Sequence, residues 1–144
     1  MRPNQAAFPR LVILAGALLA SLTPGLVSFA LAEEHVGRAT LAFSSPLPNA
    51  PGKSLTAVVV RYGPGEASPP HHHAGSVYAY VLSGMIRSQT SVGGPAKVYQ
   101  AGESFFEPPG SVHLVSANAS ATEPASLLAI FVADEGAVLT APEK

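Results

Sequence analysis

The sequence contains no cysteine, and only 12% of its 144 residues are charged. The lack of cysteine excludes disulfides, thiolate metal ligands and thiol nucleophiles. A domain of this size must therefore take its stability from a packed core, a bound metal or association with another chain. Basic residues are also few, with eight lysines and arginines against nine acidic residues. This balance argues against nucleic acid as a partner and against binding to an anionic membrane surface.

The first 32 residues have the pattern of an export signal. Two arginines begin the segment, Leu11 to Ala20 is almost wholly apolar, and residues 30–32 form an A-x-A cleavage pattern. The competing interpretation is an uncleaved anchor, because the uncharged stretch that ends at Ala32 is just long enough to span a bilayer. Pro24-Gly25 interrupts that stretch and favours cleavage after Ala32. We therefore expect an exported protein, periplasmic or secreted, in which residues 33–144 form one domain.

The rest of the chain alternates short apolar, β-branched runs with turns rich in glycine and proline. The predicted strands cover residues 40–44, 54–62, 76–82, 85–92, 96–100, 104–107, 112–117 and 126–132. No amphipathic segment of helical length follows the signal. Many short strands at even spacing predict an all-β fold, either a sandwich or a closed barrel. Residues 134–144 are polar and contain proline, so we expect them to form a loose tail.

Three of the five histidines stand together at positions 71–73, between two prolines and an apolar run. In an extended strand His71 and His73 share one face, and His72 points away as a supporting or surface residue. His113 follows a second proline-glycine turn and is well placed to complete the group. Three neutral imidazoles suit zinc, iron, copper or nickel, and do not suit calcium or magnesium. The alternative is that these histidines are solvated in loops; their same-face spacing and the flanking turns favour a metal site.

Two spaced motifs resemble those of the cupin family. The first reads Gly65-x5-His71-x-His73 with Gly84 following, and the second reads Gly102-x5-Pro108-x-Gly110-x2-His113. The resemblance extends over roughly residues 36–134. It implies a single antiparallel β-barrel of the jelly-roll, or double-stranded β-helix, type. It also implies a divalent transition metal, Fe, Zn, Cu, Ni or Mn, held inside by the three matching histidines. Because cupins often form dimers, the resemblance is compatible with a homodimer as well as with a monomer.

One position departs from the family pattern. The first cupin motif usually carries a glutamate four residues after its second histidine, and here that position is Val77. The resemblance therefore implies a site of three histidines, as in some cupins with dioxygenase activity. Glu107 is the best substitute, and we predict it as the catalytic residue, binding the metal directly or acting as a general base. The alternative is that Glu107 ends an exposed strand and has no role.

The residues around the predicted site suggest an apolar pocket. Alternation places the odd-numbered residues of the 76–82 strand on the metal side and the even-numbered residues on the other. One of Phe105 and Phe106 is expected to line the same space, and Arg87 and Gln89 are candidates for contact with a polar substrate. An apolar wall with few polar groups is the usual pattern of a small-molecule site. No phosphate-binding loop and no serine nucleophile motif is present.

Three functions fit these observations. A metal with open positions can direct dioxygenase or isomerase chemistry on a small oxygen-bearing molecule, such as an enol, a diketone or a catechol. The same barrel can bind or sense a small ligand without turnover. A third option is a structural metal that only stabilises the domain. The cupin resemblance does not choose among them, because that barrel hosts many unrelated chemistries.

Overall fold

The computed structural model describes residues 38–143, which form eleven β-strands and no helix. The all-β prediction is therefore confirmed. Within this part of the chain no helix is long and apolar enough to cross a membrane. The predicted export segment, residues 1–32, lies outside the described residues.

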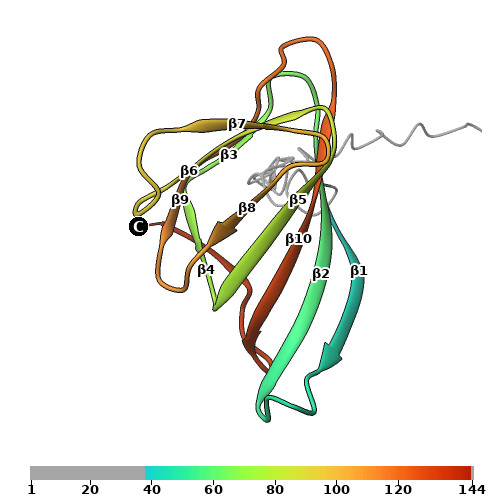
Figure 1. Cartoon of the computed structure of the whole chain (residues 1–144), viewed down its shortest axis with the longest axis vertical. Helices are drawn as coiled ribbons and strands as arrows, with labels where there is room; N and C mark the ends of the chain where they lie inside the picture. The colour runs from blue at the N-terminus through green and yellow to red at the C-terminus, as the bar shows by residue number, and fades with distance from the viewer. Residues whose placement is uncertain (1–37, 144) are drawn as a thin grey trace, which may run out of the picture.

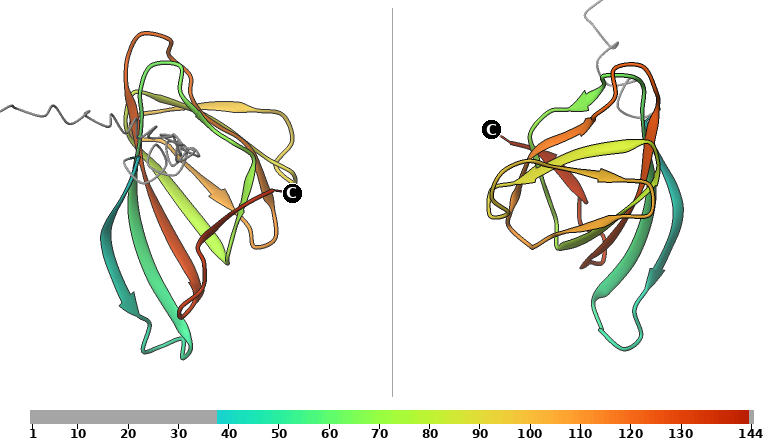
Figure 2. Two further views of the ribbon diagram at one scale, coloured as in Figure 1. Left: turned by 180° about the vertical axis from the view of Figure 1, so that it is seen from behind. Right: turned by 45° about the horizontal axis from the view of Figure 1, so that its top comes forward.

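Two antiparallel sheets form the walls of a barrel that narrows toward one end (Figure 1, Figure 2). The order of the first sheet is β1-β2-β10-β5-β8, and that of the second is β11-β4-β9-β6-β7, with β3 paired to β9. The strands of the first sheet are β1 (Ala39–Pro46), β2 (Lys53–Tyr62), β10 (Ala125–Asp134), β5 (Ser76–Ser83) and β8 (Ser104–Glu107). The second sheet contains β11 (Thr140–Pro142), β4 (His71–His73), β9 (Val112–Asn118), β6 (Met85–Thr90), β7 (Lys97–Gln100) and β3 (Ala67–Ser68).

The apolar core lies between the two sheets because alternate residues of each strand face inward. In β5 the inward residues Val77, Ala79 and Val81 are almost completely buried, while its even-numbered residues from Tyr78 to Leu82 are exposed. Phe105 is buried and Phe106 is exposed, so Phe105 is the phenylalanine that lines the interior. The predicted orientation of β5 is confirmed, as is the expectation that one of the two phenylalanines lines the interior.

The inward-facing residues are odd-numbered in β5 and even-numbered in β6, and the change occurs at the turn between the two strands. Gly84 occupies this turn with a φ of 68°, and the buried residues of β6 are even-numbered, beginning at Ile86. Arg87 is therefore exposed, and the Gln89 side chain donates a hydrogen bond to the Gly94 carbonyl in the loop that follows β6. The prediction that these two residues contact a substrate is wrong, because it continued the alternation of β5 through the turn.

Residues 140–143 pair with the chain around β4, which contradicts the prediction of a loose tail over residues 134–144; Lys144 lies outside the described residues. Thr140 pairs with His73 and Pro142 pairs with His71 in the β11–β4 ladder. Proline fits here because β11 is an edge strand, where a missing N–H costs no ladder bond. A backbone hydrogen bond from Glu143 to the Pro70 carbonyl extends the pairing. The segment therefore packs against the strand that carries the histidines.

Candidate metal centre

Two strands, β4 and β9, bring the three predicted histidine ligands together. His71 and His73 face inward from β4, while the His72 side chain is 47% exposed and its Nδ1 lies 3.5 Å from Glu143. His113 is the cross-strand partner of His71 in the β4–β9 ladder. The alternation predicted for the histidine triplet is confirmed. Nothing in the fold places His72 in the cluster.

A β-bulge in β9 determines which of its side chains point inward. Gln89 pairs with Val115 and Thr90 pairs with His113, so Leu114 is an extra residue without a partner in β6. An extra residue reverses the alternation on one side of the bulge. As a result His113 and Ser116, which are three residues apart, both face the interior and are both buried.

The three imidazoles have the spacing of a metal site. One ring nitrogen from each of His71, His73 and His113 lies within 4.8 Å of the other two. The ring centres of His71 and His73 are 4.7 Å apart, and those of His71 and His113 are 5.1 Å apart. Nitrogens gathered to this extent could hold a single ion, with bonds of about 2 Å after small rotations of the rings.

Hydrogen bonds fix which nitrogen of each ring is available. His71 Nδ1 donates to the Pro69 carbonyl at 2.7 Å, and His73 Nδ1 faces the Leu139 carbonyl at 3.2 Å and Thr140 Oγ1 at 3.1 Å. Because a carbonyl only accepts, both rings carry their proton on Nδ1 and present Nε2. In His113 the Nε2 pairs with Ser88 Oγ at 2.9 Å, which leaves Nδ1 to face the cluster.

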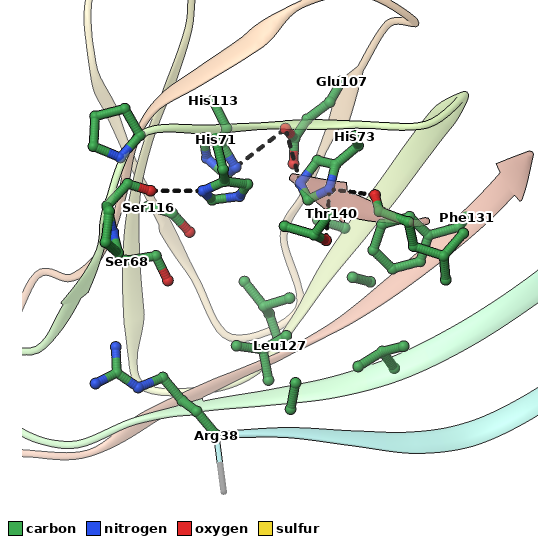
Figure 3. Close-up of a pocket in the computed structure, with 18 of the residues that line it drawn as sticks. Arg38, Ser68, His71, His73, Glu107, His113, Ser116, Leu127, Phe131 and Thr140 are labelled. Carbon is green, nitrogen blue, oxygen red and sulfur yellow. Dashed lines mark hydrogen bonds and ion pairs between the residues drawn. The ribbon is translucent and has the colours of Figure 1, made fainter. Parts of the chain in front are cut away.

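Glu107 completes the cluster from β8 (Figure 3). The residue is only 3% exposed, and its Oε2 lies 3.1 Å from His113 Nδ1 and 3.7 Å from His73 Nε2. Neither Glu107 Oε2 nor His113 Nδ1 has a hydrogen-bond partner among the described residues. Burying an unsatisfied carboxylate is costly, and a cation bound between these atoms would offset that cost. The donor set therefore fits a divalent transition metal.

Burial keeps the histidines in the form that binds metals. Desolvation lowers the pKa values of His71 and His73 below the ordinary value of 6.5, and the nearby Glu107 carboxylate opposes this effect in both. Both rings are therefore neutral at pH 7. A neutral imidazole offers the lone pair that a metal requires.

The cluster lines an open cavity of about 580 Å³. Aliphatic and aromatic side chains make up most of its wall, including Val58, Val60, Leu127, Phe131 and Leu139. Leu139 and Thr140 come from the C-terminal segment, so the ordered tail closes one side of this space. The volume lies within the range of small-molecule sites, and the predicted apolar pocket is present.

The fold and site together are those of a cupin. The family model of the cupin domain matches residues 58–131, which is more than half of the chain. This chain belongs to the cupin superfamily, as the two sequence motifs indicated.

Solved structures agree with this assignment. A conserved protein with a double-stranded β-helix domain from Klebsiella pneumoniae is 25% identical with a TM-score of 0.56, and the match covers 74% of this chain and 84% of that one. A cupin 2 conserved barrel domain protein from Salinispora arenicola is 24% identical, with a TM-score of 0.52 and coverage of 68% and 76%. No curated protein matches the chain.

Larger enzymes share only part of their length with this chain. Oxalate decarboxylase is 27% identical with a TM-score of 0.51, over 61% of this chain and 23% of that protein. The DMSP lyase DddQ from Ruegeria pomeroyi has a TM-score of 0.57 at 20% identity, over 76% of this chain and 53% of the lyase. At that identity the lyase shows the fold alone.

Several polar residues of the site have no clear sequence signal. Ser88 and Thr140 each bond to a histidine, and Tyr62, Ser68 and Ser116 bring hydroxyl groups into the cavity. Ser116 faces inward because the bulge at Leu114 reverses the alternation of β9. A search for motifs of fixed spacing detects the three histidines but not these hydroxyl-bearing residues around them.

Proposed function

We propose that this chain is an exported, metal-dependent cupin enzyme that acts on a small oxygen-bearing molecule by dioxygenase or isomerase chemistry. The observation that carries the proposal is the position of the histidine–glutamate cluster on the wall of the apolar cavity. A site with only a structural role is usually closed by protein ligands on all sides. Here a ligand of small-molecule size can reach the same atoms that would hold the metal.

In this proposal His71, His73 and His113 hold the ion, with Glu107 as a further ligand or as a base. The bound metal would supply Lewis acidity and, for a redox-active ion, electron transfer toward oxygen. The hydrogen bonds from the Nδ1 atoms of His71 and His73 keep both rings oriented before the metal arrives. Such outer partners restrict ring rotation and raise ligand basicity.

Glu107 is the residue suited to move a proton. Its carboxylate is buried, and its Oε2 atom has no hydrogen-bond partner among residues 38–143. A general base must lie within hydrogen-bond reach of the proton that it removes. A substrate that lies against the cluster would bring an acidic C–H or O–H group to this oxygen. A substrate that fills this mostly apolar cavity would displace water from it, which would strengthen these electrostatic interactions.

The comparison with oxalate decarboxylase supports the substrate class. That enzyme, which is larger than this chain, is named for a small molecule rich in oxygen. Substrates with two neighbouring oxygen atoms are suited to an ion that keeps open coordination positions. We extend only this general feature, an oxygen-bearing ligand group, to the present site.

Turnover tests the proposal. Metal-stripped protein is supplied in turn with Fe(II), Mn(II), Ni(II), Cu(II) or Zn(II) and incubated with an enol, a β-diketone or a catechol, while oxygen uptake and products are followed. We expect conversion with at least one metal, strong loss of it in Glu107→Gln and no change in Glu135→Gln, a matched control because Glu135 is exposed. Ligand binding without conversion would instead indicate a binding module. Unfolding on metal removal, with no ligand binding, would indicate a structural metal.

Export is tested separately. The N-terminal sequence of protein recovered from the export compartment is expected to begin at Glu33. A chain that still begins at Met1 and stays with the membrane would contradict cleavage and favour an anchor.

A further inference from the structure

A group of three hydroxyls, two of them buried and the third half-buried, lies in the same cavity as the histidines. Tyr62 Oη is 2.8 Å from Ser68 Oγ and 2.8 Å from Ser116 Oγ. Tyr62 is 3% exposed and Ser116 is 5% exposed, and all three residues line the cavity. They come from β2, β3 and β9, and Ser68 and Ser116 are partners in the β3–β9 ladder. Figure 3 shows the two serines near one another, on the side of the pocket away from Phe131.

A count of protons shows that this hydroxyl group has a donor to spare. Three hydroxyls carry three O–H protons, and the two hydrogen bonds among them use two. Within residues 38–143 no other hydrogen bond involves these three oxygens. One O–H therefore remains for an acceptor in the cavity, whichever hydroxyl carries it. An occupant of the cavity that accepts a hydrogen bond would satisfy this O–H.

Arg38 adds positive charge beside this group. Its guanidinium lies 5.6 Å from the centre of the Tyr62 ring, and its side chain is 15% exposed and lines the cavity. Arg38 donates from one nitrogen to the Ala67 carbonyl at 3.0 Å, and another nitrogen lies 3.5 Å from Glu66. These contacts leave further N–H donors on the guanidinium. Figure 3 shows Arg38 apart from the imidazoles, on the side of the pocket where Ser68 lies.

We infer that the substrate has two polar ends, one an oxygen group for the histidine cluster and the other a carbonyl or carboxylate oxygen for the Tyr62–Ser68–Ser116 hydroxyls. Most of the cavity that holds both groups has an apolar wall, with Val60, Leu127 and Ala129 among its residues. The body of the molecule is therefore a hydrocarbon chain or ring. This inference rests on the proposed function, because it assigns the first polar end to the metal.

Metal-chelating hydroxamates of graded length test this substrate class. In each of three series the hydroxamate binds the metal, and the far end of an alkyl chain of four to eight carbons carries a methyl, a carboxamide or a carboxylate. Dissociation constants are measured by calorimetry on zinc-loaded and on metal-stripped protein. At the best length we expect an acceptor-ended probe to bind zinc-loaded protein about tenfold more tightly than its methyl-ended counterpart. The carboxamide and carboxylate arms distinguish a neutral acceptor from an anionic one.

Variants assign the gain to the hydroxyls. In the triple variant Tyr62→Phe/Ser68→Ala/Ser116→Ala we expect the preference for acceptor ends to disappear, with unchanged affinity for the methyl-ended probes. Those probes also report that the variant is folded and holds zinc. The double variant Ser83→Ala/Ser126→Ala removes another hydrogen-bonded hydroxyl pair, which is exposed, and should keep the preference. Arg38→Gln should reduce only the preference for carboxylate over carboxamide if the acceptor is anionic.

The two proposals fail in different ways. Methyl-ended probes that bind zinc-loaded but not stripped protein, with no gain from an acceptor at any length, would overturn the second polar end and leave the metal centre intact. A gain that survives in the triple variant would also overturn it. If the stripped protein takes up no zinc, the metal centre is wrong. If zinc-loaded protein binds no hydroxamate, the metal has no position open to a ligand, and both the proposed function and this inference are wrong.

Discussion

Val77 and Glu107 face each other across the ladder between β5 and β8, and both side chains are buried. Val77 stands where the first cupin motif usually carries its glutamate. Directly opposed residues of antiparallel strands have Cβ atoms about 5 Å apart, so a carboxylate on either strand reaches much the same space. In this chain the neighbouring strand supplies the carboxylate.

This relationship predicts that the carboxylate can be moved between the strands. Glu107→Val should weaken metal binding by about tenfold or more, because the carboxylate is lost from the cluster. The double variant Val77→Glu/Glu107→Val restores the carboxylate from the opposite strand and should recover much of the affinity. Zinc dissociation constants measured in competition with a chelator give the comparison. Equal affinity in wild type and Glu107→Val would show that the carboxylate does not act on the metal.

Thr140 is predicted to orient His73. Its Oγ1 lies 3.1 Å from His73 Nδ1, beside the Leu139 carbonyl at 3.2 Å. Thr140→Val keeps the shape of the side chain and removes the hydroxyl, so metal affinity should fall by about tenfold, while Thr140→Ser should restore it. Nitrogen chemical shifts of the His73 ring report the tautomer directly. A variant with an unchanged tautomer ratio and unchanged affinity would contradict this role.

Acid should destabilise the metal-free barrel. Burial lowers the pKa values of His71 and His73 below 6.5, so the unfolded chain binds more protons than the folded one as the pH falls below about 6.5. The free energy of unfolding should therefore decrease on acidification from pH 6.5 and receive a constant contribution from these groups above it. Urea unfolding between pH 5 and 8 measures this. The double variant His71→Asn/His73→Asn should have a flatter profile; an identical profile would refute the assignment.

Gly84 is predicted to be irreplaceable for steric reasons. It has a φ of 68°, and a Cβ atom added there would lie 2.5 Å from the Pro124 carbonyl oxygen. Gly94 is a matched control, because its φ is 78° and nothing lies within 4 Å of an added Cβ. Gly94→Ala should lower the free energy of unfolding by about 1–2 kcal/mol through backbone strain alone. Gly84→Ala should lower it clearly more; similar losses in chemical denaturation would contradict the steric explanation.

The elements that the sequence predicted well are those with strong local patterns. The run from Ser54 to Tyr62 is β-branched, and it forms β2 within one residue of the expected bounds. The clustering of His71, His73 and His113 was predicted because motif spacing and strand alternation gave the same residues. Glu107 faces the cluster, although its orientation was undetermined from sequence.

The errors arose where local pattern and tertiary structure disagree. β11 has only three residues, one of them proline, and only its pairing with β4 makes it a strand. The inward position of Ser116 depends on the bulge at Leu114, and the outward position of Arg87 depends on the turn at Gly84. A bulge or turn that reverses alternation leaves no mark in the periodicity of either flanking run.

Metal content tests the central claim most directly. Protein purified without chelators is analysed for bound metal in the wild type and in His71→Ala, His73→Ala and His113→Ala, with His72→Ala as the matched control. We predict one transition-metal ion per chain in the wild type and in His72→Ala, and loss of metal in the other three variants. A wild type without metal, which also fails to take up any added divalent ion, would contradict the metal centre.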